Sequence, residues 1–428
     1  MRYTTFISKS ARIVCAAAAL TVLGACDNLL EVSDPQSIQS GQLEDPALEN
    51  LLVNGVVGEF QFAYGYYALW SGVLSDEVFT DHTNVSVREF SLHNFNDLND
   101  ITTGAYENIH RARQSADDAS ARLKVMLGAN ASSSLNMARV MAYGGYAYVL
   151  LAEGFCGSPV NLSAELPPEE LFKRGIARFD TAIIVATASK TGASAANIAA
   201  ATDLINMSNV GAARAALKMG DLAKAKTYAA LVPANYEKLA YYSSNSVREN
   251  NQLNRPARTA DPFLGVAPAF FSLNDPRVPR LATSRPGLNS NPIFPPQRPF
   301  MYTGWSASAV VPIDITTTIK FATGLEAQYV IAEADGATAA TLAFVNARRA
   351  VGNQAPVSLA GAALMAELRD QRARDFFLTG QRLGDLRRYL KGGLDLFPKG
   401  KYPVFTDFYG ENQCFMVPLS EKAGNPNY

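Results

Sequence analysis

Apolar residues recur at every fourth position of one stretch in the N-terminal part of the chain. A repeat of this period places its side chains on one face of an α-helix, whereas the side chains of a strand alternate between two faces. Asp45 and Pro46 stand directly before the repeat, at positions suited to an N-cap and a first helical residue. We therefore expect a long helix with one buried face to begin here. The repeat consists of Leu48, Leu52, Val56, Phe60 and Tyr64.

Similar patterns predict helices along most of the chain. Residues 135–155, LNMARVMAYGGYAYVLLAEGF, are apolar almost all round, as expected for a helix inside a bundle. The uninterrupted apolar part of this stretch, Tyr146–Ala152, is too short to cross a bilayer, which takes about 20 residues. Further helices are expected within 106–119, 171–186, 209–232, 324–352 and 364–390.

Two stretches between the expected helices differ from them in composition. Residues 256–312 hold 11 of the 22 prolines, and proline disrupts helix interiors, so an ordered, loop-rich region is expected there. Residues 185–202, VATASKTGASAANIAAAT, are low in complexity. We expect a surface loop at 185–202, with a weak alanine-rich helix as the alternative.

The beginning of the chain is typical of an exported protein. Basic residues precede an apolar run from Ile13 to Leu23, which is too short to span a bilayer and matches a secretory signal. Residues 23–26, LGAC, resemble the bacterial lipobox, in which cleavage precedes a cysteine that becomes acylated. We expect residues 1–25 to be removed and Cys26 to be lipidated, which would hold the protein stably on a membrane. The alternative is an ordinary signal peptide with an incidental cysteine.

Charge and cysteine content limit the partners further. The formal net charge of −1 argues against a nucleic-acid-binding surface. Of the four cysteines, Cys15 leaves with the signal and Cys26 is expected to carry lipid. An exported compartment permits a disulfide between the remaining two, Cys156 and Cys414, and two buried free thiols are the alternative.

Residues 209–232 have the features of two packed antiparallel helices. Alanines occur where the helices would touch, and Gly220-Asp221 stands at the expected turn. Small residues let two helices pack closely, and the arrangement resembles a tetratricopeptide helix pair. The 34-residue period of such repeats is not clean, so we expect irregular tetratricopeptide-like pairs.

The whole set of motifs resembles the SusD/RagB family, surface lipoproteins that bind nutrients for a TonB-dependent outer-membrane transporter. Two departures from the family are Thr379, where an acid usually precedes the glycine, and short loops. The matching stretches, in the family's order, are the lipobox with CDNLLEVSDPQSI, AEGFCGSPVN, the helix pair around Gly220-Asp221, LNDPRV, EAQYVIAEADG with VNARRAVG, RARDFFLTGQRLGDLRRY and FMVPLSEKAGNPNY.

The resemblance implies a mainly α, SusD-like fold, in which irregular tetratricopeptide-like helix pairs support a loop-rich region with little β structure. After the signal peptide at 1–25 it implies one domain over 26–428. Its N-terminal helical half would span 26–250, and its loop-rich and C-terminal helical half 251–428.

The resemblance also implies a function. The protein would be a non-enzymatic, lipid-anchored protein of the outer membrane, exposed at the cell surface. It would bind an oligosaccharide and deliver it to a SusC-like TonB-dependent transporter. Two alternatives are a RagB-type uptake protein that binds peptide and an envelope scaffold whose tetratricopeptide-like groove binds a protein. A glycoside hydrolase that uses Asp76 and Glu77 is a third class.

Sugar binding favours flat aromatic rings next to amides and carboxylates. One such cluster ends the first expected helix, in FAYGYYALW followed by SDE, and the other is MYTGW in the proline-rich region. The alternative for the first cluster is burial in the core, because its rings continue the buried stripe. The candidate ligand-binding residues are Tyr66, Tyr67, Trp70, Asp76, Tyr302 and Trp305.

No cofactor is expected. The three histidines do not form a metal-binding pair such as HExxH. Residues 93–100, HNFNDLND, offer oxygen atoms to a structural calcium ion, but more simply supply turn and helix-cap residues. Near the C-terminus, helical spacing predicts the ion pairs Asp370–Arg374 and Arg382–Asp385, which we interpret as structural.

Overall fold

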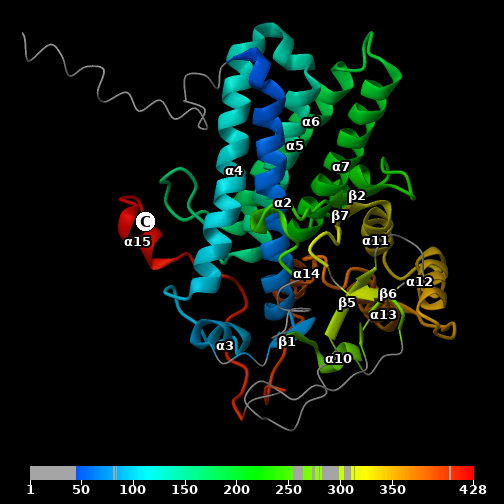
Figure 1. The fold of residues 1–428 in the computed structure, drawn as a ribbon. Helices are drawn as coiled ribbons and strands as arrows, with labels where there is room; N and C mark the ends of the chain where they lie inside the picture. Colours follow the sequence, from blue (N-terminus) through cyan, green and yellow to red (C-terminus); the bar gives the residue numbers. More distant parts are fainter. Residues whose placement is uncertain are drawn as a thin grey trace, which may run out of the picture. The chain divides into compact units, whose positions relative to one another are not determined.

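The computed structural model describes residues 45–428 except 81, 83, 254–263, 272–274, 279, 282–297, 303–309, 313 and 404–405. Residues 46–428 form one compact unit (Figure 1). Helices dominate the described part of the chain and strands are short, so the prediction of a mainly α fold with little β structure is confirmed. None of the described helices is both long and apolar enough to cross a membrane.

Long helices form the N-terminal half of this unit (Figure 1). They are α2 (Glu49–Leu74), α4 (Asp100–Leu127), α5 (Leu135–Gly154), α6 (Pro168–Ala188) and α7 (Ala195–Met219). A 3-10 turn, η2 (Pro46–Leu48), precedes α2, whose predicted stripe is buried at Val56, Phe60 and Tyr64. Helix α5 packs against α2, α4, α6 and α7. Every residue from 140 to 154 of α5 is buried, which explains why its sequence is apolar all round.

The predicted helix pair at 209–232 is present. Helix α7 ends at Gly220, whose φ of 87° lies in the left-handed region that glycine adopts without strain. Asp221 then caps α8 (Leu222–Ala229) by accepting a hydrogen bond from the backbone N–H of Lys224. The loop expected at 185–202 is wrong for most of its length. Helix α6 continues to Ala188, and Ser194 caps α7, so only 189–194 form the connection.

The C-terminal half contains shorter helices around a second, smaller core. Tyr329, Val345 and Phe376 belong to this core. Its helices are α11 (Gly324–Asp335), α12 (Ala339–Val351), α13 (Gly361–Asp375) and α14 (Arg382–Lys391). The remaining described helical segments are α3 (Val85–Ser91), η3 (Gly128–Ser133), η4 (Val247–Glu249), α10 (Pro268–Phe271) and α15 (Leu419–Gly424).

The strands form three small antiparallel sheets. Strand β1 pairs with β3, β2 pairs with β7, and β4, β5 and β6 form the third sheet in that order. The register places Val78 opposite Val266, and Glu237 opposite Thr323. The described strands are β1 (Val78–Thr80), β2 (Glu237–Ala240), β3 (Leu264–Val266), β4 (Arg280–Leu281), β5 (Arg298–Tyr302), β6 (Val310–Pro312) and β7 (Ile319–Thr323).

Buried ion pairs join the two halves. Arg214 on α7 donates from Nε to Glu326 of α11 at 2.6 Å, and both side chains are about 1% exposed. Asp385 on α14 accepts from Lys218 Nζ at 2.6 Å and from Arg372 Nε at 2.8 Å. The predicted partner of Asp385 was therefore wrong: Arg382 donates instead to the backbone oxygen of Ser75. These charges hold helices of distant sequence together.

Candidate ligand-binding site

The first predicted aromatic cluster is mostly part of the core. Tyr67 is 0% exposed and packs edge-on against Phe415. Trp70 is 5% exposed and packs edge-on against Phe90. Tyr66 is half-buried and donates a hydrogen bond to the backbone oxygen of Ile101. The expectation of an open ring platform thus fails for Tyr67 and Trp70, because their rings continue the buried stripe of α2.

The second predicted cluster is described only in part. Tyr302 ends β5, and its backbone pairs with Val310 of β6. Trp305 lies outside the described residues, as does Cys26. Strand β3 packs against β5 and pairs with β1, which follows α2 directly. The topology therefore brings the end of α2 and the strand that carries Tyr302 to the same part of the molecule.

The acidic residues after α2 face inward. Asp76 accepts a hydrogen bond from the Tyr409 hydroxyl at 2.7 Å. Burial raises the pKa of Asp76 to about 6, although that hydrogen bond and the charge of Arg382 lower it in part. Glu77 is 0% exposed, and its Oε1 accepts from the backbone N–H of Leu378 at 3.1 Å. Burial raises the pKa of Glu77 to about 8, so this group is mostly a neutral acid at pH 7.

The two acids therefore do not form the pair that the hydrolase alternative requires. A glycosidase places two carboxyl groups on opposite sides of a sugar bond, with access to the substrate. Glu77 is enclosed by protein instead.

A C-terminal hairpin that we did not single out from the sequence covers this end of the molecule. The backbone N–H of Tyr402 donates to the oxygen of Asp407 at 2.9 Å, and the Tyr402 hydroxyl bonds to both the N–H and the oxygen of Thr80, each at 2.9 Å. The rings of Tyr402 and Tyr409 pack edge-on, 5.1 Å apart. Phe408 between them points outward and is 68% exposed.

The alternation in TDFYG was a usable indication of this arrangement, because neighbouring residues of an extended chain face opposite sides. Polar groups accompany the exposed ring. Asp407 forms an ion pair with Arg88 of α3, and both side chains are partly exposed, at 38% and 43%. Phe408 is thus an open aromatic surface with a carboxylate and a guanidinium on neighbouring parts of the chain.

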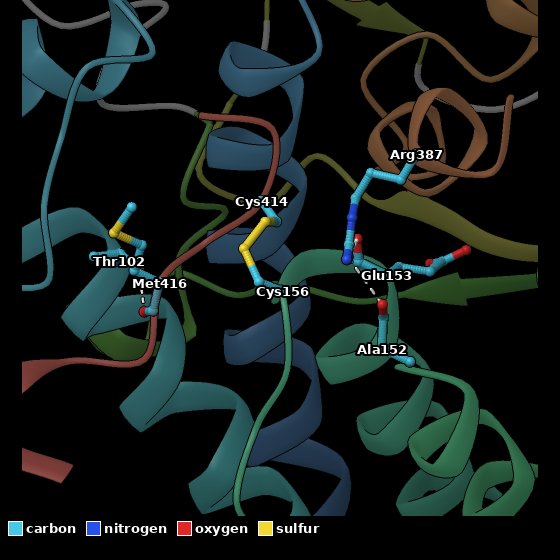
Figure 2. The surroundings of a disulfide bond; sticks show 7 residues. All are labelled: Thr102, Ala152, Glu153, Cys156, Arg387, Cys414 and Met416. Atoms are coloured by element: carbon cyan, nitrogen blue, oxygen red, sulfur yellow. Dashed lines mark hydrogen bonds between the residues drawn. A yellow bond between two sulfur atoms is a disulfide. The ribbon is translucent and has the colours of Figure 1, made fainter. Parts of the chain in front are cut away.

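A disulfide ties the segment after this hairpin to α5 (Figure 2). The structure joins Cys156 to Cys414, with their Cα atoms 5.3 Å apart, rather than leaving two free thiols. Phe415 pairs with Phe155 in a short bridge, and its backbone N–H donates to the oxygen of Gly154 at 2.8 Å. Figure 2 also shows Thr102 of α4 donating to the backbone oxygen of Met416.

The stretch at 93–100 serves as turn and cap. Asn99 caps α4 by accepting from the backbone N–H of Ile101, and Asn96 accepts from that of Leu98. His93 is buried, and burial lowers its pKa to about 4. Within the described residues, no group of histidine, cysteine and acidic side chains is arranged to hold a metal ion.

We compared the sequence and the fold with those of known proteins. No protein-family model and no curated protein matches the sequence. Among solved structures, a SusD superfamily protein from Bacteroides thetaiotaomicron superposes with a TM-score of 0.69 at 12% identity, covering 89% of this chain and 98% of that one. Surface glycan-binding protein A from the same organism, in complex with laminarihexaose, gives 0.64 at 13% identity, covering 89% and 98%. A SusD superfamily protein from Parabacteroides distasonis gives 0.61 at 15% identity, covering 91% and 98%.

The helix bundle with tetratricopeptide-like pairs and small, short-stranded sheets is typical of a class of mainly α proteins. Within that class, the chain has the SusD fold, as its motifs predicted.

Proposed function

We propose that the protein is a cell-surface lipoprotein that binds an oligosaccharide and delivers it to a SusC-like TonB-dependent outer-membrane transporter. The observation that carries the proposal is the match of the fold over 89% of the chain to a glycan-binding protein in complex with laminarihexaose. Another structure with this fold is a laminarin-binding SusD-like protein. The lipobox at Cys26 supports attachment to the outer membrane.

The C-terminal hairpin supplies a candidate contact surface for the sugar. A pyranose ring has apolar C–H faces, which pack on an exposed aromatic ring, and a rim of hydroxyls, which bond to charged groups. Phe408 offers the ring, while Asp407, the residue before it in the chain, and Arg88, the ion-pair partner of Asp407, offer an acceptor and donors. The hairpin is fixed to β1 through Tyr402, so little conformational freedom is lost on binding. Phe408 replaces Tyr67 and Trp70 as our candidate platform.

Binding without turnover fits the site better than hydrolysis. The two acids of the hydrolase alternative are Asp76, which accepts a hydrogen bond from Tyr409, and Glu77, which is enclosed by protein. The proposal therefore assigns the protein no catalytic residues and no cofactor.

Calorimetric titration of the mature protein with laminarihexaose, other oligosaccharides and peptides tests the proposal. We expect at least one oligosaccharide to bind without being cleaved. We expect Phe408→Ala to weaken that binding by about fivefold to thirtyfold, since a ring stacked on a ligand contributes on the order of 1–2 kcal/mol. The matched control is Tyr241→Ala. Tyr241 is an exposed aromatic residue, and its neighbour Tyr242 donates a hydrogen bond to the backbone oxygen of Gln61 in the middle of α2.

Three results would contradict the proposal. Binding of peptides alone would favour the RagB-type or scaffold alternatives, and cleavage of the oligosaccharide would revive the hydrolase. An unmodified amino terminus on the mature protein, seen by mass spectrometry, would remove the anchor. Copurification with an outer-membrane barrel, lost in Cys26→Ser, is the expected result for delivery.

A further inference from the structure

A cavity lies where the end of α5 meets α6, α7 and α14. Its volume is about 290 Å³. This size is close to the lower limit of ordinary small-molecule sites, about 300 Å³, and suits a ligand of about one sugar ring. Phe172, Met219 and Pro168 give it an apolar wall, and charged side chains form the rest.

Two acids line this cavity: the exposed Glu169, which forms an ion pair with Lys173 at 3.2 Å, and the buried Glu153. Glu153 is 1% exposed, and neither of its carboxylate oxygens has a hydrogen-bond partner among the described residues. Lys218 Nζ lies 3.5 Å from Oε1 but directs its hydrogen bond to Asp385, at 2.6 Å. Gly384 of α14 adds no side chain over the carboxylate, since a Cβ there would lie 2.7 Å from Oε1. Buried acceptors without donors are costly, so Glu153 is suited to a ligand that supplies them.

Besides Lys218, whose Nζ forms a 3.5 Å ion pair with Oε1 of this acid, Arg387 and Lys391 line the same cavity. Arg387 reaches from α14 to the end of α5, where it donates to the backbone oxygens of Ala152 at 3.0 Å and Glu153 at 2.8 Å (Figure 2). Among the described residues neither Arg387 nor the exposed Lys391 has a carboxylate within ion-pair distance, and burial lowers the pKa of Arg387 to about 10. Arg388, also in the lining, is by contrast neutralised by Glu333.

These charges select the ligand's chemistry. A guanidinium and an ammonium without counter-ions favour a carboxylate. The donor for Glu153 is better neutral than charged, because the Lys218 ammonium already lies 3.5 Å away and would repel a second cation. A carboxylate that also carries hydroxyl groups satisfies both requirements, whereas an amino acid would place its ammonium beside Lys218.

We propose that this cavity binds a small polyhydroxylated acid, such as a monomeric sugar acid. Arg387 and Lys391 hold its carboxylate, and Glu153 accepts hydrogen bonds from its hydroxyls. The site does not depend on glycan binding at Phe408, and the two are tested separately.

The experiment is a calorimetric titration of the full mature protein with D-glucuronate, D-glucose and glycine, each in turn. We expect D-glucuronate to bind with one-to-one stoichiometry and at least tenfold more tightly than either of the others. We expect Lys391→Ala and Glu153→Gln each to weaken that binding by about tenfold, while Lys391→Ala leaves laminarihexaose binding unchanged. The control is Lys190→Ala, just past the other end of α6, about 30 Å away along the helix.

Absence of D-glucuronate binding at millimolar concentration would overturn the proposal. So would equal or tighter binding of glycine, or D-glucuronate binding that Lys391→Ala does not change. Lys391 is exposed, so the test does not depend on Glu153→Gln folding correctly.

Discussion

Two buried acids, in two regions of the molecule, are held in opposite states of charge. Burial alone would raise the pKa of Asp385, but Arg372, Lys218 and Arg388 lower it well below its usual range. Burial also raises the pKa of Glu77, and there Arg382 and one backbone N–H offset it only partly, leaving the value at about 8. Asp385, between the helices, therefore stays charged and is surrounded by counter-ions. Glu77, beside the candidate ligand surface, keeps its proton instead.

The largest effect is expected at Asp385. Asp385→Asn removes the charge that Lys218 and Arg372 share, and breaking a buried pair in this way costs about 3–5 kcal/mol of unfolding free energy. Urea unfolding of the purified protein measures it. The control is Asp395→Asn, which breaks a surface pair with Lys399 and should change the stability little. An equal loss of unfolding free energy in Asp385→Asn and Asp395→Asn would show that the buried charge contributes no more to stability than the surface one.

The disulfide connects the helix bundle to the hairpin, because it joins the end of α5 to the segment that follows Tyr402 and Tyr409. Replacing both cysteines, Cys156→Ser with Cys414→Ser, should lower the unfolding free energy by about 2–4 kcal/mol. Hydrogen exchange should rise first in the hairpin at 401–409, since its link to α5 is lost. Uniform loss of protection across the helices, with none specific to the hairpin, would contradict this assignment.

Glu77→Gln tests the opposite behaviour of the second acid. As pH rises from 4.5 to about 8, the unfolded carboxyl loses its proton while the folded one retains it, so this group makes the protein less stable with rising pH. The glutamine cannot titrate, so the stability of this variant relative to the unchanged protein should rise by about 3–4 kcal/mol between pH 5 and pH 8. Thermal melts of both proteins across this range measure the difference. A difference that does not change with pH would show that Glu77 titrates normally.

The smallest effect on stability is expected at the partly exposed ion pair between Arg88 and Asp407. Arg88→Ala breaks the partly exposed pair with Asp407 and should change the unfolding free energy by under about 1 kcal/mol. Its effect should instead appear as weaker oligosaccharide binding. A loss of several kcal/mol in urea unfolding would mean that the hairpin is part of the scaffold rather than a ligand surface.

Much of the fold follows from local sequence. The four-residue repeat predicted α2, and Gly220-Asp221 predicted the turn between α7 and α8, because a left-handed residue and a helix cap have clear residue preferences. The ion pairs were harder to predict from the sequence. Helical spacing suggested Arg382 as the partner of Asp385, but Lys218 lies 167 residues away and is placed there only by tertiary packing.

The candidate site was harder to predict than the scaffold. Tyr67 and Trp70 have the residue types of a sugar platform, yet the face of α2 on which they lie determines their burial. Phe408 has the same type of side chain and is exposed, because it alternates with Tyr402 and Tyr409 on an extended hairpin. Aromatic composition alone does not distinguish the two cases. The cavity at Glu153 depends on four helices meeting, which no single motif records.

The covalent link between Cys156 and Cys414 also sets an order of events during biosynthesis. The two residues are 258 positions apart, so the bond cannot form until the chain has been synthesised at least as far as Cys414. Until then Cys156 has no partner for this bond and remains a free thiol. Alkylation of the Cys156 thiol before the C-terminal segment has been made should therefore prevent the bond from forming.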